Sequence, residues 1–184
     1  MKINYAILPL VALMAITRVH HFGSAIALPD ASLAVFFLAG LCFRNRAILV
    51  GLLLEAGVLD YVAINAFSVS DWCISPAYLF LIPTYGALWL AGRYSSRFAN
   101  LDVAAFAYTL SLATLASSVA FLISNGSFYL FSGRYAEMAA YDYATAVAHY
   151  YGPYVSTALL YSAIGLVVIK ARQVIVSQSQ HREI

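Results

Sequence analysis

AILVGLLLEAGVLDYVAINAF, residues 47–67, is an almost unbroken apolar run. A helix that spans a bilayer needs about 20 predominantly apolar residues. In lipid such a run must be helical, because an open strand would leave backbone polar groups unpaired. Two acidic residues, Glu55 and Asp60, interrupt the run. Because an ionisable residue inside a span is costly, it marks a functional site by default.

The two acidic residues leave different alternatives open. Asp60 is either a site residue or a partner in a hydrogen bond that packs two helices together. Glu55 lies five residues earlier, about 140° around the same helix. We expect it to face the interior of the bundle, and the sequence names no partner for it.

The composition of the whole chain agrees with a membrane protein. Of its 184 residues, 63% are hydrophobic and only 10% are charged, whereas soluble proteins carry about 25% charged residues. So few charges could not cover a water-soluble globule of this size. The first apolar run is followed by Arg18-Val19-His20-His21 rather than by a small-residue cleavage site. We therefore expect a retained first helix, not a signal peptide.

Helix-breaking residues and the lengths of the apolar runs divide the chain into six predicted transmembrane helices. Together they form a single all-α domain, residues 1–184. They cover residues 3–17, 30–43, 47–67, 77–91, 101–124 and 154–171. Pro29, Pro76 and Pro153 precede or open three of these helices, as proline tolerates a first turn. Pro83 falls inside the fourth predicted helix and predicts a kink there.

Basic residues predict the orientation. Eight of the ten fall on one side of the predicted bundle: Lys2, Arg44, Arg46, Arg93, Arg97, Lys170, Arg172 and Arg182. Only Arg18 and Arg134 fall on the other side. Positive residues mark the cytoplasmic side, so both termini are predicted to be cytoplasmic. The outward connections are then residues 18–28, 68–75 and 125–152, which contain most of the reactive side chains.

Cys73 is the most distinctive residue of the outward face, in Asp71-Trp72-Cys73-Ile74-Ser75-Pro76. The other cysteine, Cys42, is predicted near the inner face. A disulfide needs Cα atoms within about 7 Å, so the two cannot pair within one chain. Cys73 is then either a small buried hydrophobe, an intermolecular bridge, or a thiolate ligand for a soft metal.

Three histidines share the outward side with Cys73: His20, His21 and His149. Imidazole is the commonest metal ligand, so one alternative is a small membrane metalloprotein or enzyme with a Cys/His zinc or copper site on the outer face. A histidine at a membrane boundary is more often simply an interfacial polar residue. The sequence contains no phosphate-binding glycine loop, no H-E-x-x-H and no G-x-S-x-G, which disfavours the nucleotide hydrolase, zinc protease and serine hydrolase classes.

Tyrosines are concentrated in the last connection and its exit. Eight of the 14 lie between Tyr129 and Tyr161. An interfacial aromatic belt is one explanation, but a belt would be shared more evenly between the two faces. The other explanation is a lid over a broad amphipathic ligand, with hydroxyls that bond polar groups at its rim. On this argument Trp72, Tyr135 and Tyr141 are candidate ligand-binding residues.

Four segments resemble the BtuM family of cobalamin-specific S-components, which are related to energy-coupling-factor (ECF) transporters. They are Thr17-Arg18-Val19-His20-His21-Phe22-Gly23, Leu28-Pro29-Asp30-Ala31-Ser32, Leu59-Asp60-Tyr61 and Trp72-Cys73-Ile74-Ser75-Pro76-Ala77-Tyr78. The specific part of the resemblance is the first 85 or so residues. The resemblance in chain length and in number of membrane spans extends over nearly the whole chain.

The resemblance implies a six-helix S-component fold in the bacterial cytoplasmic (inner) membrane, which captures cobalamin (vitamin B12) from outside. It implies that Cys73 is the axial ligand of the cobalt, with His21, Asp60 and Tyr78 as pocket residues. Cobalt then arrives with the substrate, and no permanently bound metal is expected. A thiolate that enters could also displace cyanide from cyanocobalamin, which is ligand exchange rather than conventional enzymology; we expect a transporter.

One departure concerns the energy source. Many S-components carry A-x-x-x-A on the first helix for docking on the coupling subunit, but here Ala12 and Ala15 do not have that spacing. Transport without an ECF module is therefore an alternative. A further alternative is an S-component that binds another ligand. Nickel and cobalt-ion types would show a histidine after the start methionine, where this chain has Lys2.

Overall fold

The computed structural model describes residues 7–18, 28–67, 69–72, 74–98 and 102–182. In this part of the chain every regular element is a helix, which confirms the predicted all-α class. The elements are α1 (Leu8–Arg18), α2 (Ser32–Cys42), α3 (Arg46–Phe67), the 3-10 helix η2 (Pro76–Phe80), α4 (Leu81–Ser95), α5 (Val103–Phe131), α6 (Ala140–Ala148) and α7 (Tyr151–Arg182).

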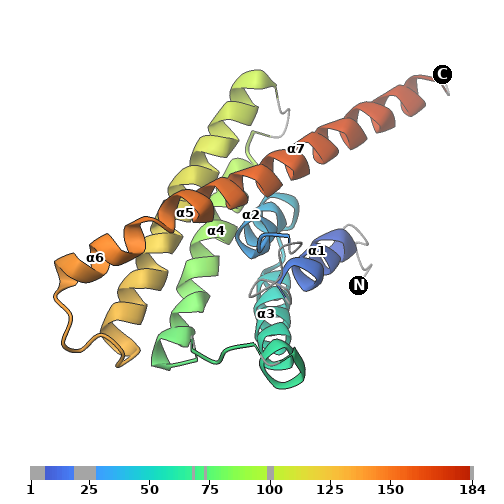
Figure 1. The fold of residues 1–184 in the computed structure, drawn as a ribbon. Coiled ribbons are helices and arrows are strands. Elements are labelled where there is room, and N and C mark those ends of the chain that lie inside the picture. The colour runs from blue at the N-terminus through green and yellow to red at the C-terminus, as the bar shows by residue number, and fades with distance from the viewer. Residues whose placement is uncertain (1–6, 19–27, 68, 73, 99–101, 183–184) are drawn as a thin grey trace.

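Helix α2 lies at the centre of the bundle (Figure 1). It contacts α1, α3, α4, α5 and α7, and its residues 32–40 are all buried. A helix that is apolar all round can lie in a protein core or face lipid. The contacts with five other helices place Phe36, Phe37 and Leu38 of α2 in the core.

Two glycines allow α2 and α4 to pack backbone to backbone. A Cβ atom at Gly40 would collide with the carbonyl oxygen of Trp89, and one at Gly92 would collide with that of Phe37. Small residues at such crossings let helices approach closely and gain van der Waals contact in lipid. The α2–α4 pair therefore forms the rigid centre on which the other helices pack.

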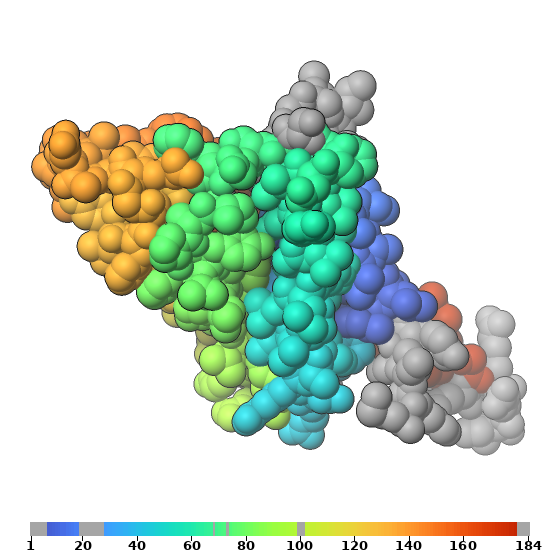
Figure 2. Space-filling model, turned by 90° about the horizontal axis from the view of Figure 1, so that it is seen from below, coloured from blue at the N-terminus to red at the C-terminus, as the bar shows by residue number. Residues whose placement is uncertain are grey.

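In the described part of the chain, three helices are long and apolar enough to cross a membrane: Arg46–Phe67, Val103–Phe131 and Tyr151–Ser179. Helix α2 has 11 residues, a rise of only about 16 Å, which is less than the bilayer core of about 30 Å. Figure 2 shows the surface of α3 between α4 and α1. The structure thus has membrane-protein character, and the crossing of all six helices stays a prediction.

The long aromatic connection contains more helix than the sequence predicted. A helix overlaps each of the six predicted ranges, but α5 continues to Phe131 and α7 begins at Tyr151. Between them lies α6, which the sequence analysis did not predict. The C-terminal part of α7 extends away from the bundle (Figure 1), and residues 171–179 are exposed.

Pro83 does not kink the interior of a helix, contrary to the prediction. The chain forms η2 from Pro76 to Phe80 and only then begins α4 at Leu81. Pro83 is therefore in the first turn of α4, where the backbone N–H that proline lacks would have no partner within the helix. The proline thus lies near the start of α4 and not in a helix interior, where it was predicted.

Candidate functional site

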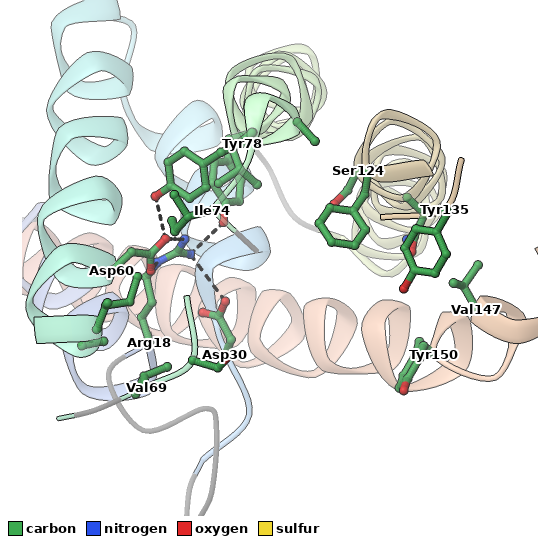
Figure 3. A pocket seen from close by; sticks show the side chains of 18 of the residues that line it. Arg18, Asp30, Asp60, Val69, Ile74, Tyr78, Ser124, Tyr135, Val147 and Tyr150 are labelled. Atoms are coloured by element: carbon green, nitrogen blue, oxygen red, sulfur yellow. Dashed lines mark hydrogen bonds and ion pairs between the residues drawn. The ribbon is translucent and has the colours of Figure 1, made fainter. Parts of the chain in front are cut away.

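A cavity of about 400 Å³ opens between two unlike walls (Figure 3). We call the first the polar wall: Arg18, Asp30, Asp60, Tyr78 and Tyr85. We call the second the aromatic wall: Phe128, Tyr135, Tyr143 and Tyr150. The volume lies within the range of about 300–1,000 Å³ typical of small-molecule sites. The cavity opens among the helix ends opposite to those that carry Arg44, Arg46, Arg93 and Arg97.

Arg18 is the centre of the polar wall. It is the last residue of α1, and only 6% of its surface is exposed. Its Nε and Nη2 donate to Oδ1 and Oδ2 of Asp60, both at 2.7 Å. This is the bidentate geometry in which an arginine–carboxylate pair is strongest. The pair lets both ionised groups lie inside an otherwise apolar bundle.

The remaining bonds of Arg18 connect the pair to two more helices. Its Nη1 donates to the Ser32 hydroxyl of α2 at 2.9 Å and to the Tyr85 hydroxyl of α4 at 2.7 Å. The Tyr85 ring is itself held by stacking on Phe36, with centroids 4.2 Å apart. One guanidinium thus joins α1, α2, α3 and α4 around the floor of the cavity.

Asp60 receives a third hydrogen bond from η2. The Tyr78 hydroxyl donates to Asp60 Oδ2 at 2.6 Å, in addition to the two bonds from Arg18. Two of the residues that the sequence singled out, Asp60 and Tyr78, therefore touch each other and line the cavity. Asp60 also makes hydrogen bonds that hold helices together, which was the alternative interpretation of this residue.

Asp30 closes the polar wall at the start of α2. Its Oδ1 accepts from the Ser32 backbone N–H at 2.9 Å and from the Ser32 hydroxyl at 2.6 Å. Its Oδ2 lies 3.6 Å from Arg18 Nη1. Thr17 holds the neighbouring backbone, since its hydroxyl oxygen accepts from the Ala31 N–H at 3.1 Å. The segment before α2 is therefore fixed against the end of α1.

The aromatic wall is held by ring contacts more than by hydrogen bonds. Tyr135 packs edge-on against Phe128 and Tyr143, with centroids 5.9 and 4.8 Å apart. The Tyr143 hydroxyl donates to the Asn125 carbonyl at 3.1 Å. Burial raises the pKa of Tyr143 above its ordinary value, and the neighbouring Tyr135 adds to the shift. The Tyr143 hydroxyl therefore stays protonated and able to donate.

A cation–π contact connects the two outer connections. The guanidinium carbon of Arg134 lies 3.8 Å from the centroid of Trp72, well within the distance of about 6 Å at which such pairs attract. Trp72 itself does not line the cavity, but its neighbours Ser70 and Ile74 do. The contact therefore links the connection before η2 to the connection after α5.

The structure describes some of the predicted ligand-binding residues and not others. Cys73 and His21 lie outside the described residues, as does His20. Tyr135 lines the cavity together with Asp60 and Tyr78. Tyr141 is 78% exposed on α6 and does not line it.

Three residues without an assigned role are also placed. The His149 ring contacts that of Tyr150 in a tilted arrangement, with centroids 3.7 Å apart. Glu55 is partly buried, and its Oε1 has no hydrogen-bond partner among the described residues. Cys42 is a free thiol at the end of α2.

The described residues form no group of three or more His, Cys, Asp or Glu side chains that could hold a metal ion. Of the four ligands predicted for a zinc or copper site, three (Cys73, His20 and His21) lie outside these residues. The fourth, His149, contacts an aromatic ring rather than another ligand type. The described structure therefore adds no donor to the metalloprotein alternative.

Sequence reasoning missed Arg18 as a site residue and treated it as part of an outer connection. Two signals could have found it. Arg18 directly follows an apolar run, and Asp60 lies inside another. An acid buried in a membrane helix needs a partner, and on the predicted topology Arg18 is the cation at the same depth.

The comparisons with known proteins add no relative. No protein-family model matches the chain, and no curated protein matches it.

Proposed function

We propose that this protein is a membrane subunit that captures cobalamin from outside the cell for uptake. The observation that carries the proposal concerns the neighbours of Cys73. Ser70 and Ile74, which flank Cys73 in the sequence, line the same cavity as Asp60 and Tyr78. Each of the four segments that resemble cobalamin-specific S-components thus has a described residue in the lining of one cavity: Arg18, Asp30, Asp60 and Tyr78.

The two walls suit different parts of such a ligand. A corrin is a broad ring with an apolar face and a rim of amide side chains. Aromatic residues such as Tyr135 and Tyr143 offer flat surface to the ring, and the polar wall offers hydrogen-bonding groups to the amides. Cobalamin is larger than the cavity, so part of it would lie within and the remainder above the rim.

The orientation supports capture from outside. The cavity lies at the end of the bundle opposite to the four arginines of the α2–α3 and α4–α5 connections, and arginines favour the cytoplasmic side. On this proposal six helices cross the inner membrane and both termini are cytoplasmic. Without A-x-x-x-A on the first helix, transport does not depend on docking to a standard ECF module through that motif.

The proposed role of Cys73 is axial ligation of the substrate cobalt. The thiol loses its proton, and the thiolate then enters one of the two axial positions of the corrin. With cyanocobalamin the departing ligand is cyanide, which takes up the proton. Cobalt keeps its oxidation state in this exchange, so no reductant is needed.

Visible spectroscopy of purified protein with cyanocobalamin tests both binding and ligation. We expect the vitamin to co-elute with the protein and its spectrum to change as sulfur enters the cobalt sphere. Cys73→Ala should remove the spectral change and leave weaker binding. Cys42→Ala is the matched control, because it deletes the other thiol, at the opposite end of α2 from the cavity, and should leave the spectrum as in the wild type.

Three outcomes would contradict parts of the proposal. If cobalamin fails to co-elute with the folded protein, the function is wrong. If the vitamin binds with an unchanged spectrum, cobalt–sulfur bonding is wrong. A colourless protein that contains stoichiometric zinc or copper would favour the metalloprotein alternative instead.

A further inference from the structure

Arg18 directs most of its N–H donors at other residues of the protein, so few of them could bind a ligand. A guanidinium carries five N–H donors. Four of them are directed at Asp60, Ser32 and Tyr85. Only 5% of the Arg18 side chain is exposed. Arg18 therefore serves as an internal counter-ion, not as a binding group for a ligand anion.

The two aspartates of the polar wall are more accessible than the arginine. Their side chains are 29% exposed for Asp30 and 20% exposed for Asp60. Among the described residues that line the cavity, one arginine and two aspartates are charged, so their formal charges sum to −1. Arg18 lies between the two acids (Figure 3) and is less exposed than either, so a ligand in the cavity would meet more carboxylate than guanidinium surface.

The carboxylate oxygens of Asp30 and Asp60 differ in how many hydrogen bonds they already accept. Asp60 Oδ2 already accepts from Arg18 and Tyr78, and Asp30 Oδ1 accepts twice from Ser32. Asp30 Oδ2 accepts no hydrogen bond from the described residues; its contact with Arg18 is an ion pair at 3.6 Å. This oxygen is available to a donor on the ligand.

We propose that Asp30 is a specificity-determining residue that admits ligand side arms which donate hydrogen bonds and rejects anionic arms. An amide N–H₂ can donate to Asp30 Oδ2, whereas a carboxylate would bring like charge beside an acid whose nearest cation, Arg18, is shared with Asp60. The inference rests on the proposed function. For a corrinoid, the cavity selects the amidated rim over a rim that bears carboxylates.

The test compares two corrinoids with the same axial ligands at pH 7. One is cyanocobalamin; the other is cyanocobalamin whose primary side-chain amides have been partly hydrolysed to carboxylates. We expect the purified wild-type protein to bind the carboxylate form about tenfold more weakly or worse, because like charges meet at low dielectric. Affinities are measured by equilibrium dialysis, with the corrinoid followed by its absorbance.

Substitution of Asp30 assigns the effect to this residue. Asp30→Asn keeps an oxygen to accept from Ser32 and removes the charge, so the tenfold preference should largely disappear. Asp142→Asn is the matched control, because Asp142 lies on α6 and does not line the cavity; it should keep the wild-type preference. Thermal unfolding of each variant verifies that it is folded.

The outcomes separate this inference from the proposed function. Equal affinity of the wild type for the two corrinoids would overturn the inference and leave cobalamin capture intact. A preference that survives Asp30→Asn in a folded protein would overturn the role of Asp30. Absence of cyanocobalamin binding would overturn the proposed function, and this inference with it.

Discussion

The polar wall and the aromatic wall border the same cavity but are built on different physics. In the polar wall Arg18, Asp60 and Tyr78 are joined by short, charge-assisted hydrogen bonds among three elements, α1, α3 and η2. In the aromatic wall, rings such as Tyr135 and Tyr143 meet edge to face, with one hydroxyl bonded to a carbonyl. The first wall fixes geometry and charge, and the second supplies adaptable contact area.

The two walls differ in how much stability is lost when one of their contacts is removed. A buried ion pair must be complete, because loss of one partner leaves a charge without compensation. Ring contacts contribute individually about 0.5–1.5 kcal/mol beyond the area they bury, and loss of one leaves no charge exposed. Substitutions in the polar wall should therefore cost more than substitutions of the same size in the aromatic wall.

The largest effect is expected from Arg18→Met. This change leaves the partly buried Asp60 without its counter-ion and should lower the free energy of unfolding by about 3 kcal/mol, the lower end of the cost of breaking a buried pair. Thermal or denaturant unfolding in detergent measures the loss. Arg134→Gln is the control, because it removes the other outward arginine, which is exposed. An equal loss in both variants would contradict the special cost of breaking the Arg18–Asp60 pair.

A double variant keeps this prediction testable if Arg18→Met alone does not fold. Arg18→Met with Asp60→Leu removes both charges at once, and an apolar replacement of a buried pair is often tolerated. We expect the double variant to recover much of the stability lost by the single one. Failure to recover would show that the pair acts through more than its charges.

The intermediate effect compares one hydroxyl from each wall. Tyr78→Phe removes a hydrogen bond to a carboxylate and should cost about 1.5–3 kcal/mol, whereas Tyr143→Phe removes one to a neutral carbonyl and should cost about 0.5–1.5 kcal/mol. The two substitutions delete the same atom, so they are matched in size. Unfolding midpoints that rank in the reverse order would show that the ionised Asp60 adds nothing to the bond.

The smallest effect is expected where the outer connections meet. Trp72→Leu removes the cation–π contact with Arg134, which at an exposed position contributes about 0.5–1 kcal/mol. Arg134→Gln removes the same contact from the other side, and the two changes combined should cost little more than either alone. Unfolding of the two single variants and the double variant measures this coupling. Fully additive losses would mean that the two side chains do not interact.

Part of the site could be predicted because single residues reveal it. Asp60 stands out as an acid within an apolar run, and Tyr78 entered through the resemblance. The bonds that join them to Arg18 could not be derived, because they depend on how α1, α3 and η2 cross. Asp30 was visible only as a helix start; its free oxygen appears once Ser32 and Arg18 are placed around it.

Some helices could be predicted from the sequence, whereas others depend on tertiary packing. Long apolar runs such as residues 47–67 are helical in lipid whatever their neighbours. Helix α6 has only nine residues, and a helix that short depends on packing more than on its own sequence. Pro83 predicted a kink, but whether it falls inside a helix or in its first turn depends on where the chain changes from η2 to α4.

The sequence by itself determined that the protein is all-helical and has membrane character, because so apolar a chain must satisfy its backbone internally. It also determined that Asp60 would need a partner. Only the tertiary structure decided that the partner is Arg18, that Asp30 keeps an open acceptor, and that the cavity has two unlike walls. These depend on distances between residues far apart in sequence, and a local pattern carries no information about such distances.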